Sequence, residues 1–584
     1  MDSLALEDLT SELLGLVNGQ SQTQFFTKGG SRLANDELDF RQRELGIFAQ
    51  DEWKALSNLT LTYGLRWEYY GVPFEAHGNL SNLFQDPSGA APALAGGGNG
   101  FTFTPVGPGT GHQLYQNYYR NFEPRVGFAW DPFKKGKLSI RGGIGAFSDR
   151  VYGNLVSDAR GNPPFQPSLF NQIFFNAFAS GNFLSTAQLQ AQVAPQQLTA
   201  SPVVTNLDPN TFVGGLTFPD LFATNMKPPS SVAWNFGIQQ QVTSRLTLEI
   251  NYVGNHGTRI LRVLDGNPPQ PSLISALLAG GVPPSALQYN ILYYGAEIGA
   301  LPFDAVNNNA FLHTFTDQTS GHSWYDGLQS QLTLRDFHGL QAGVAYTWSH
   351  ALDDSSDPLV QTTGNGNYPV DSFALNREFG NSGFDTRQRA VVNFIYQPGI
   401  GRGKNFLSGG PVGRIFEGWQ ISGIASFQTG LPYDIFGPVD TLHTGIGDRA
   451  TVINPSALKT LPATGKFSPG GGVFKGFNAA AFNLEDGVSA PIPWGIPANV
   501  VRNNWYGPGV NNWDVALSKT TVLTERVKLQ LRLETYNLFN RTQFTKPTNN
   551  TASGGILGYS YGQAGQNDGT TGARQVQLSA KVTF

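Results

Sequence analysis

The chain has 584 residues, no cysteine and a formal net charge of −4 from 38 basic and 42 acidic side chains. The lack of cysteine excludes disulfides, zinc–thiolate sites and cysteine nucleophiles, and the near balance of charge provides no electrostatic footprint for nucleic acid, which is therefore not an expected partner. Charged residues are only 14% of the chain, against ~25% in ordinary soluble domains, so the composition favours strands and long uncharged loops.

The first segment, residues 1–42, is interpreted as an N-terminal remnant with a possible first strand near 20–29. Residues 1–19 include four acidic side chains and lack the basic start and uninterrupted apolar core of a secretory signal. The longest tempting apolar run, 273–282, ends at two prolines and falls short of the ~20 residues of a transmembrane helix. A membrane protein with this sequence must therefore cross as a closed barrel, since only helices and barrels satisfy their backbone in lipid.

From residue 43 onward, two-residue periodicity predicts strands. The last eleven residues, RQVQLSAKVTF, place Val, Leu, Ala, Val and Phe on one face and polar residues on the other. Most predicted strands have ten residues or more, as a tilted transmembrane strand of ~9–11 residues requires. The thirteen predicted strands are 43–53, 58–68, 122–131, 137–149, 231–242, 245–254, 323–335, 339–350, 387–397, 416–429, 511–521, 526–539 and 574–584.

The connections between these strands alternate strictly between short and long. The short ones are 54–57, 132–136, 243–244, 336–338, 398–415 and 522–525, and the long ones are 69–121, 150–230, 255–322, 351–386, 430–510 and 540–573. Short periplasmic turns and long extracellular loops produce this alternation in outer-membrane barrels. The sequence therefore predicts an all-β, transmembrane, antiparallel up-and-down β-barrel over 43–584, with Phe584 at the periplasmic side.

Tryptophans and charges support the same architecture. Eight tryptophans fall near predicted strand ends, where aromatic girdles meet the membrane surface, and the other two fall in a long loop: 53, 67, 130, 234, 324, 348, 419 and 513 against 494 and 505. Charged residues on the polar strand faces must point into a hydrated lumen, since lipid would not accept them. These residues are Arg66, Arg141, Glu249, Arg335, Lys528, Arg532 and Glu534.

Candidate chemistry is sparse. His350, Asp353 and Ser355 are the residue types of a hydrolase triad, but they lie within six residues of sequence, whereas triads are assembled in space. Asp353, Asp354 and Asp357 could ligate calcium, although they lack the EF-hand spacing. The simpler interpretation of both sets is a polar loop after strand 339–350. No catalytic, metal-binding or cofactor-binding residue is assigned, and the chain is not expected to be an enzyme.

Aromatic residues in the long loops are a weaker hint of ligand binding, because aromatic faces stack on sugars and apolar ligands. The alternative interpretation is that they pack the loops against one another. They are Tyr115, Tyr118, Tyr119, Tyr289, Tyr293, Tyr294, Trp494, Trp505 and Tyr506.

Five segments together resemble TonB-dependent receptors of the large Oar-like type. They are RNNWYGPGVNNWDVALSKTTVLTERVKLQLRLETYNLFNRTQF (502–544), GWQISGIASFQTGLPY (418–433), NSGFDTRQRAVVNFIY (381–396) and RELGIFAQDEW with LTLTYGLRWEYY (43–53 and 59–70). The resemblance implies a 22-stranded barrel around a plug, uptake of an extracellular ligand driven by the TonB complex, and a terminal strand, ending at Phe584, that the barrel-assembly machinery reads. Only about 13–14 strands are found by the alternation rule, without plug or TonB box, so the chain is interpreted as the C-terminal portion of such a receptor.

The expected function is therefore that of an outer-membrane receptor and transport barrel in a Gram-negative bacterium, surrounded by outer-membrane lipid and acting on an unidentified ligand. One alternative is a self-contained, passive porin-like channel of fourteen strands, which requires 20–29 to pair with 574–584. A second is a surface adhesion protein whose loops contact other cells. An outer-membrane hydrolase ranks last.

Overall fold

The structure is a computed structural model whose described part consists mostly of strands. It describes residues 19–35, 37–85, 101–151, 153–162, 164–166, 168–172, 178–179, 182–183, 220–265, 279–281, 315–357, 369–401, 404, 406–407, 409–435, 449–457, 481–482, 499–507, 509–541 and 573–584. One sheet of fifteen strands dominates these residues, and six two-stranded sheets accompany it. Within the described residues, no helix is both long enough and apolar enough to span a membrane.

All thirteen predicted strands are present as the long strands of the large sheet, so their prediction is confirmed; the two further strands of the sheet, Asp220–Phe222 and Gly380–Asn381, are short and were not predicted. In chain order the thirteen long strands are β5 (Glu44–Leu56), β6 (Leu59–Tyr70), β10 (Asn121–Trp130), β11 (Leu138–Ser148), β16 (Ser230–Gln241), β17 (Leu246–Asp265), β18 (Phe315–Phe337), β19 (Leu340–Asp353), β21 (Gln388–Tyr396), β22 (Trp419–Gln428), β25 (Val510–Val522), β26 (Lys528–Tyr536) and β27 (Gln575–Thr583).

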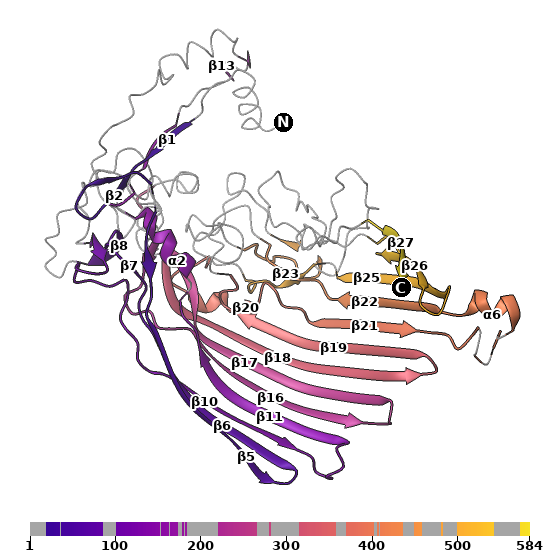
Figure 1. Cartoon of the computed structure of the whole chain (residues 1–584). Coiled ribbons are helices and arrows are strands. Elements are labelled where there is room, and N and C mark those ends of the chain that lie inside the picture. The colour runs from indigo at the N-terminus through magenta and orange to yellow at the C-terminus, as the bar shows by residue number, and fades with distance from the viewer. Residues whose placement is uncertain are drawn as a thin grey trace.

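Each long strand pairs antiparallel with its neighbours in sequence, from β5 at one edge to β27 at the other. Figure 1 shows the result, a curved trough with β5 and β27 at opposite margins. Because thirteen strands alternate in direction, the two edge strands run the same way. Among the described residues, β5 pairs only with β6 and β27 only with β26.

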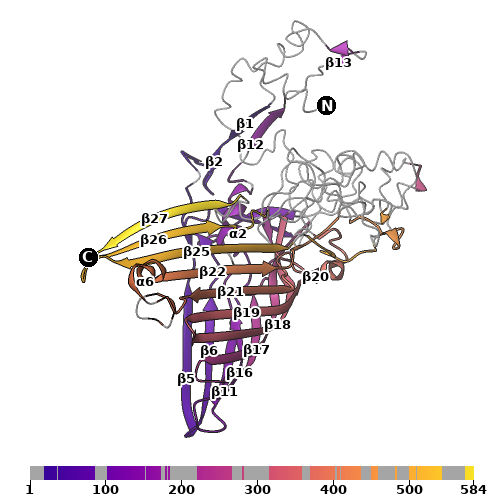
Figure 2. The ribbon, with the colours of Figure 1, turned by 90° about the vertical axis from the view of Figure 1, so that its right-hand side faces the viewer.

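Most of the small elements lie at the end of the trough where β6, β11 and β17 end, and β1 and β13 extend away from it (Figures 1 and 2). The small elements are β1 (Gly19–Thr23), β2 (Phe25–Phe26), β3 (Arg32–Leu33), β4 (Phe40–Arg41), β7 (Phe74–Glu75), β8 (Leu80–Gln85), β9 (Phe101–Val106), α2 (Gly153–Asp158), η1 (Ala159–Gly161), β12 (Ser168–Gln172), β13 (Phe178–Ala179), β14 (Asn182–Phe183), β15 (Asp220–Phe222), η2 (Leu375–Glu378), β20 (Gly380–Asn381), β23 (Pro432–Tyr433) and β24 (Trp505–Tyr506). The helix α6 (Gly410–Phe416) lies at the opposite end, with the short turns.

The weak strand predicted near 20–29 exists in part, but outside the large sheet. β1 pairs with β12 and β2 pairs with β3. The pairing of 20–29 with 574–584 that a closed fourteen-stranded barrel requires is therefore not made.

Two strands, β17 and β18, are much longer than predicted. The connection expected at 255–322 is partly strand, because β17 continues to Asp265 and β18 begins at Phe315. The pairing shifts register between Thr258 and Leu261, and such a bulge interrupts the period-two pattern that reveals a strand in sequence. Beyond the bulge, loops cover the hairpin and bury Leu261 and Val263. Both faces of the hairpin are covered there, so polar and apolar residues no longer alternate along the strands.

The two faces of the trough differ as the alternation predicts. The convex face exposes large apolar residues, a continuous surface that soluble monomers rarely show; examples are Leu45, Ile47, Trp53, Leu65, Phe122, Val126, Ile144, Leu531, Val576 and Leu578. On the opposite face Arg66 pairs in register with Phe48 and Glu123, and Arg532 pairs with Ser518 and Ser579. This second face is polar and is the lumen wall of the predicted barrel.

Candidate functional site

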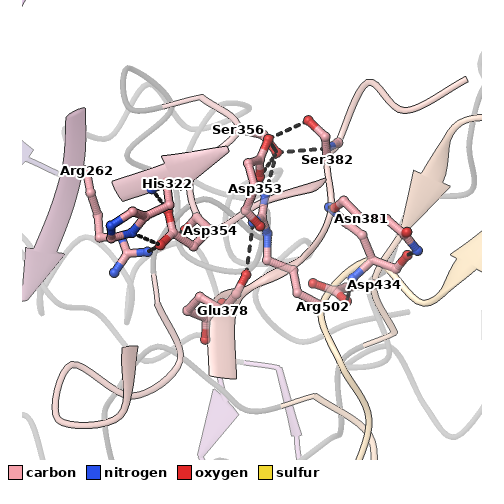
Figure 3. A network of polar contacts seen from close by, with 12 residues as sticks. Arg262, His322, Asp353, Asp354, Ser356, Glu378, Asn381, Ser382, Asp434 and Arg502 are labelled. Carbon is pink, nitrogen blue, oxygen red and sulfur yellow. Dashed lines mark hydrogen bonds and ion pairs between the residues drawn. The ribbon is translucent and has the colours of Figure 1, made fainter. Parts of the chain in front are cut away.

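The polar motif at the end of β19 lies inside a buried network that ties the extracellular loops together (Figure 3). The described residues after β19, 354–357 and 369–387, meet described residues between β22 and β25, 429–435, 449–457, 481–482 and 499–507. Five charged residues form its centre, and we call them the loop lock: Asp353, Glu378, Asp434, Arg449 and Arg502. All five are at most 3% exposed.

Arg502 is the first cation of the loop lock. Its guanidinium contacts a carboxylate oxygen of Asp353 at 2.7 Å and donates to the backbone carbonyls of Asp353 at 2.9 Å and Glu378 at 3.1 Å. The Asp353 carboxylate also accepts hydrogen bonds from the hydroxyls of Ser356 and Ser382. Both charges are therefore paired and hydrogen-bonded, which a buried ion pair needs in order to offset its desolvation.

Arg449 is the second cation. Its Nε lies 3.1 Å from Asp434 Oδ2, and its terminal nitrogens contact Glu378. Burial opposes the charge on Arg449, but the carboxylates of Asp434 and Glu378 outweigh it and hold the pKa of the guanidinium above its usual value. Asp434 also contacts the residue that follows Arg502, because its Oδ1 accepts a hydrogen bond from the backbone N–H of Asn503 at 2.6 Å. The two ion-pair groups thus act as one unit.

Neutral contacts extend the lock toward the sheet. The amides of Asn381 and Asn503 each donate to the other's backbone carbonyl at 2.8 Å. The Tyr506 hydroxyl donates to Asp385 at 2.8 Å and accepts from Arg387 at 3.0 Å. Together these bonds tie β24 and the residue Asn503 before it to β20 and to the residues that precede β21.

A second ion pair anchors the extended hairpin to the same loop. Arg262, on the part of β17 beyond the bulge, contacts Asp354 Oδ2 at 2.5 Å and is 1% exposed. Asp354 also accepts from the backbone N–H of His322 at 2.7 Å. The loop after β19 is therefore held on both sides.

The hydrolase and calcium hypotheses find no support in this geometry. His350 Nε2 contacts Asn381 Oδ1 at 2.8 Å, whereas Asp353 and Asp354 face arginines. In the part of the chain that the structure describes, no three acidic or histidine residues are grouped as metal ligands. The predicted loop begins later than expected, because β19 continues through His350 to Asp353 and only the residues from 354 onward leave the strand. The network itself could not be predicted from the sequence, because Glu378, Asp434, Arg449 and Arg502 are distant in sequence from Asp353.

Most of the described aromatic residues of the loops pack against other protein residues and do not form an open ligand site. Tyr115 is 5% exposed in a core formed by the loops, Trp505 packs edge-on against Phe482 at 5.6 Å, and Tyr506 belongs to the network above. Tyr118 lies beneath the Arg259 guanidinium at 5.1 Å, and Tyr119 stacks on Tyr69 at 5.0 Å while staying 56% exposed. The remaining predicted aromatics, Tyr289, Tyr293, Tyr294 and Trp494, lie outside the described residues.

The lumen wall carries paired charges. Arg532 contacts Glu534 at 2.7 Å, Glu249 accepts from Asn251 at 2.8 Å, and Arg125 lies 3.7 Å from Glu123. Glu123 and Arg125 were not singled out from the sequence, although the alternation that places Arg66 on this face also places them there.

Comparison with known proteins gives one family and a set of structures. The family model described as "Outer membrane beta barrel domain" matches residues 3–577. No curated protein matches the sequence.

One similar solved structure is the FrpB iron transporter from Neisseria meningitidis, with 13% sequence identity and a TM-score of 0.37 over 94% of this chain and 46% of that chain. A second is the ferripyoverdine receptor of Pseudomonas aeruginosa, with 10% identity and a TM-score of 0.37 over 95% of this chain and 40% of that chain. A third is the outer membrane transporter YddB from Escherichia coli, with 10% identity and a TM-score of 0.39 over 93% of this chain and 54% of that chain. The chain spans about half the length of these three proteins.

Proposed function

Because the chain belongs to the outer membrane β-barrel domain family, and so is a protein of the Gram-negative outer membrane, we propose that it forms part of a receptor and transport barrel for TonB-dependent uptake of an extracellular ligand. The protein would act as a conduit and not as an enzyme. The observation that carries the proposal is the direction of the edge strands β5 and β27.

Both edge strands run toward the end that carries the short turns, so they cannot pair antiparallel with each other. Bacterial single-chain barrels close with an even number of antiparallel strands, and an open edge cannot persist in lipid because its backbone groups would lack partners. We therefore propose that further strands, beyond those described, complete a wider barrel. This arrangement favours the transport receptor over the passive porin-like channel.

The position of the N-terminal segment supports the same proposal. The described residues before β5 pack among the extracellular loops: the Lys28 backbone N–H donates to Asn79 at 3.0 Å, and the Phe26 backbone N–H donates to Phe165 at 2.9 Å. We propose that residues 1–42 are a segment separate from the barrel portion 43–584.

The proposal implies four partners. Outer-membrane lipid covers the convex apolar face, the barrel-assembly machinery reads the terminal strand ending at Phe584, and the TonB complex energises the full-length protein. The fourth partner is the extracellular ligand, which must pass the loops held by the loop lock.

Planar-bilayer recording of the purified full-length protein in KCl tests conduit against pore. In a receptor, a plug fills the lumen of the barrel, so no steady conductance is expected. A passive porin-like channel should conduct continuously. Steady conductance would reject the receptor.

Site-directed cross-linking in cells tests the energy source. A photoreactive residue series in the periplasm-facing part of the full-length protein should capture TonB, and the yield should rise when ligand is present. A protein that yields no TonB adduct, yet loses cell–cell contact when its loops are deleted, would instead be the adhesion protein.

A further inference from the structure

We propose that a cavity at the extracellular mouth of the lumen binds a neutral saccharide. The cavity measures about 470 Å³, within the ~300–1,000 Å³ of small-molecule sites. Four neighbouring strands, β11, β16, β17 and β18, form it together with the loop after β19. Six serines line it, and we call it the serine pocket: Ser148, Ser230, Ser231, Ser323, Ser355 and Ser356. By register, Ser231 and Ser323 point their side chains to the lumen, whereas Ser148 and Ser230 point theirs to the opposite face.

The floor of the serine pocket is one row across the sheet. Phe147 pairs in register with Ser231, Ser231 with Gly257, and Gly257 with Ser323, and all four residues lie on the lumen face. A Cβ added at Gly257 would lie 2.8 Å from Ile260 Cδ1 and closer still to Ser323 Oγ. Glycine at this position therefore keeps the floor open between two hydroxyl-bearing strands.

The opposite wall is held rigidly by ion pairs. Asp354, which precedes the two wall serines, is fixed by Arg262 at 2.5 Å. Ser356 Oγ is already used, because it donates to Asp353 at 2.8 Å and accepts from the backbone N–H of Gly383 at 2.7 Å. Such a preformed wall would bind without the entropy cost of ordering a loop.

Ser355 differs from its neighbour. The residue is 5% exposed, and its Oγ has no hydrogen-bond partner within the described part of the chain. Buried hydroxyls are normally hydrogen-bonded, so one that is not requires an explanation. Because Ser355 lines the serine pocket, a turn of its side chain toward the cavity would let a ligand hydroxyl supply the missing partner.

The chemistry of the wall points to an uncharged, hydroxyl-rich ligand. The hydroxyls of Ser231 and Ser323, which lie on the lumen face, and the Asn255 amide both donate and accept hydrogen bonds, as sugar hydroxyls do. The charged side chains at the rim do not offer a site for an anion: Arg150 contacts Glu44 at 3.2 Å, and Asp149 would repel one. The ring of Phe147, 40% exposed, adds an apolar face of the kind that stacks on sugar C–H groups.

This inference names the ligand class of the proposed receptor and so rests on the proposed function. Its test is binding of the detergent-solubilised full-length protein to an array of fluorescently labelled neutral oligosaccharides, with ferric citrate and tripeptides as comparison probes. We expect at least one oligosaccharide to bind. Ser355→Ala should weaken that binding about tenfold without lowering stability, since no protein partner is lost, and Ser231→Phe should abolish it by filling the floor.

Ser422→Ala is the matched control, because Ser422 lies on the lumen face of β22 outside the serine pocket. Its affinity should equal that of the wild type. If no oligosaccharide binds, if only the comparison probes bind, or if Ser355→Ala and Ser231→Phe bind as tightly as the control, the inference is wrong. Tight oligosaccharide binding with no energy-dependent uptake by cells would keep the serine pocket and reject the transport function.

Discussion

Arg502 joins two loops through one side chain, since its partner Asp353 lies 149 residues away in sequence. Both side chains are almost wholly buried, at 1% and 3% exposure. Such a pair holds its loops in one arrangement, because the partner replaces water around each buried charge. If the two loops move apart while the charges stay buried, both charges are left unpaired, which is costly. The loop lock therefore shapes the extracellular mouth.

Replacing Arg502 with Ala should release the loops. The change leaves Asp353 buried without a counter-charge, which costs ~3–5 kcal/mol, so the extracellular loops should be cut much faster by protease on intact cells. Arg150→Ala is the control, since its pair with Glu44 is exposed and such pairs contribute ~0–1 kcal/mol. Equal cleavage rates for the two variants would show that the loop lock does not hold the loops.

Ionisation of Tyr506 should destabilise the folded loops at alkaline pH. Burial, aided by the hydrogen bond to Asp385, raises the pKa of the Tyr506 hydroxyl above its usual value. A raised pKa means that the folded loops prefer the neutral phenol, so its contribution is complete below pH ~10 and is lost as pH rises through the raised value. Protease sensitivity of the loops should increase in that alkaline range in the wild type and much less in Tyr506→Phe, which lacks the ionisable group. Identical alkaline profiles would exclude this role for Tyr506.

At the residue scale, the sequence predicts positions on a strand but not partners in a loop. Arg66 and Arg532 could be assigned to the lumen because period-two alternation fixes the face of every strand residue. Arg449 and Glu378 could not be paired, since their contact depends on how two long segments fold over each other. His350, Asp353 and Ser355 are neighbours in sequence that the structure directs to different surroundings.

At the scale of the elements, β18 spans membrane and loop. Trp324 lies in the middle of this strand, not near its end as predicted, because the hairpin with β17 continues beyond the aromatic girdle. There Trp324 meets Trp234 edge-on at 5.7 Å, as neighbouring girdle residues do. The membrane-crossing part of β18 is therefore its second half.

A charge on the lipid face of that second half should be poorly tolerated. Leu332 lies on the convex face between Leu248 and Val344, midway between the girdle and the short turn. Leu332→Arg should lower the free energy of unfolding in lipid vesicles by ~2–4 kcal/mol.

The neighbouring Gln331→Arg is the control, because residue 331 faces the lumen opposite Glu249. It should unfold at nearly the wild-type urea concentration. Equal destabilisation by both substitutions would mean that the faces are assigned wrongly.

Strand prediction succeeded where one face meets lipid and the other meets the lumen, since that contrast creates the alternation. It failed for β7, β8, β9 and β24, which are short and owe their form to packing among the loops. It also failed beyond the bulge of β17, where both faces are covered.

At the scale of the whole molecule, the parity of the long strands is what distinguishes the proposed functions. In the described part of the chain the large sheet has thirteen long strands, an odd number, so its two edge strands run in the same direction. The described residues before β5 pair with other loop residues and not with β27. The trough thus has the curvature and polar inner wall of a barrel but leaves both edges for other strands. That property separates a portion of a wide receptor from a small closed pore.

The most direct test is disulfide cross-linking in the outer membrane, which is clean because the chain has no native cysteine. One cysteine is placed at Ile47 of β5 and another, in turn, at each position of β27; the register pair Leu533→Cys with Leu578→Cys on β26 and β27 is the positive control. We predict an efficient disulfide in the control and none between β5 and β27, because other strands lie between them. Efficient cross-linking of β5 to β27 would mean that thirteen strands close on themselves, and would contradict the receptor.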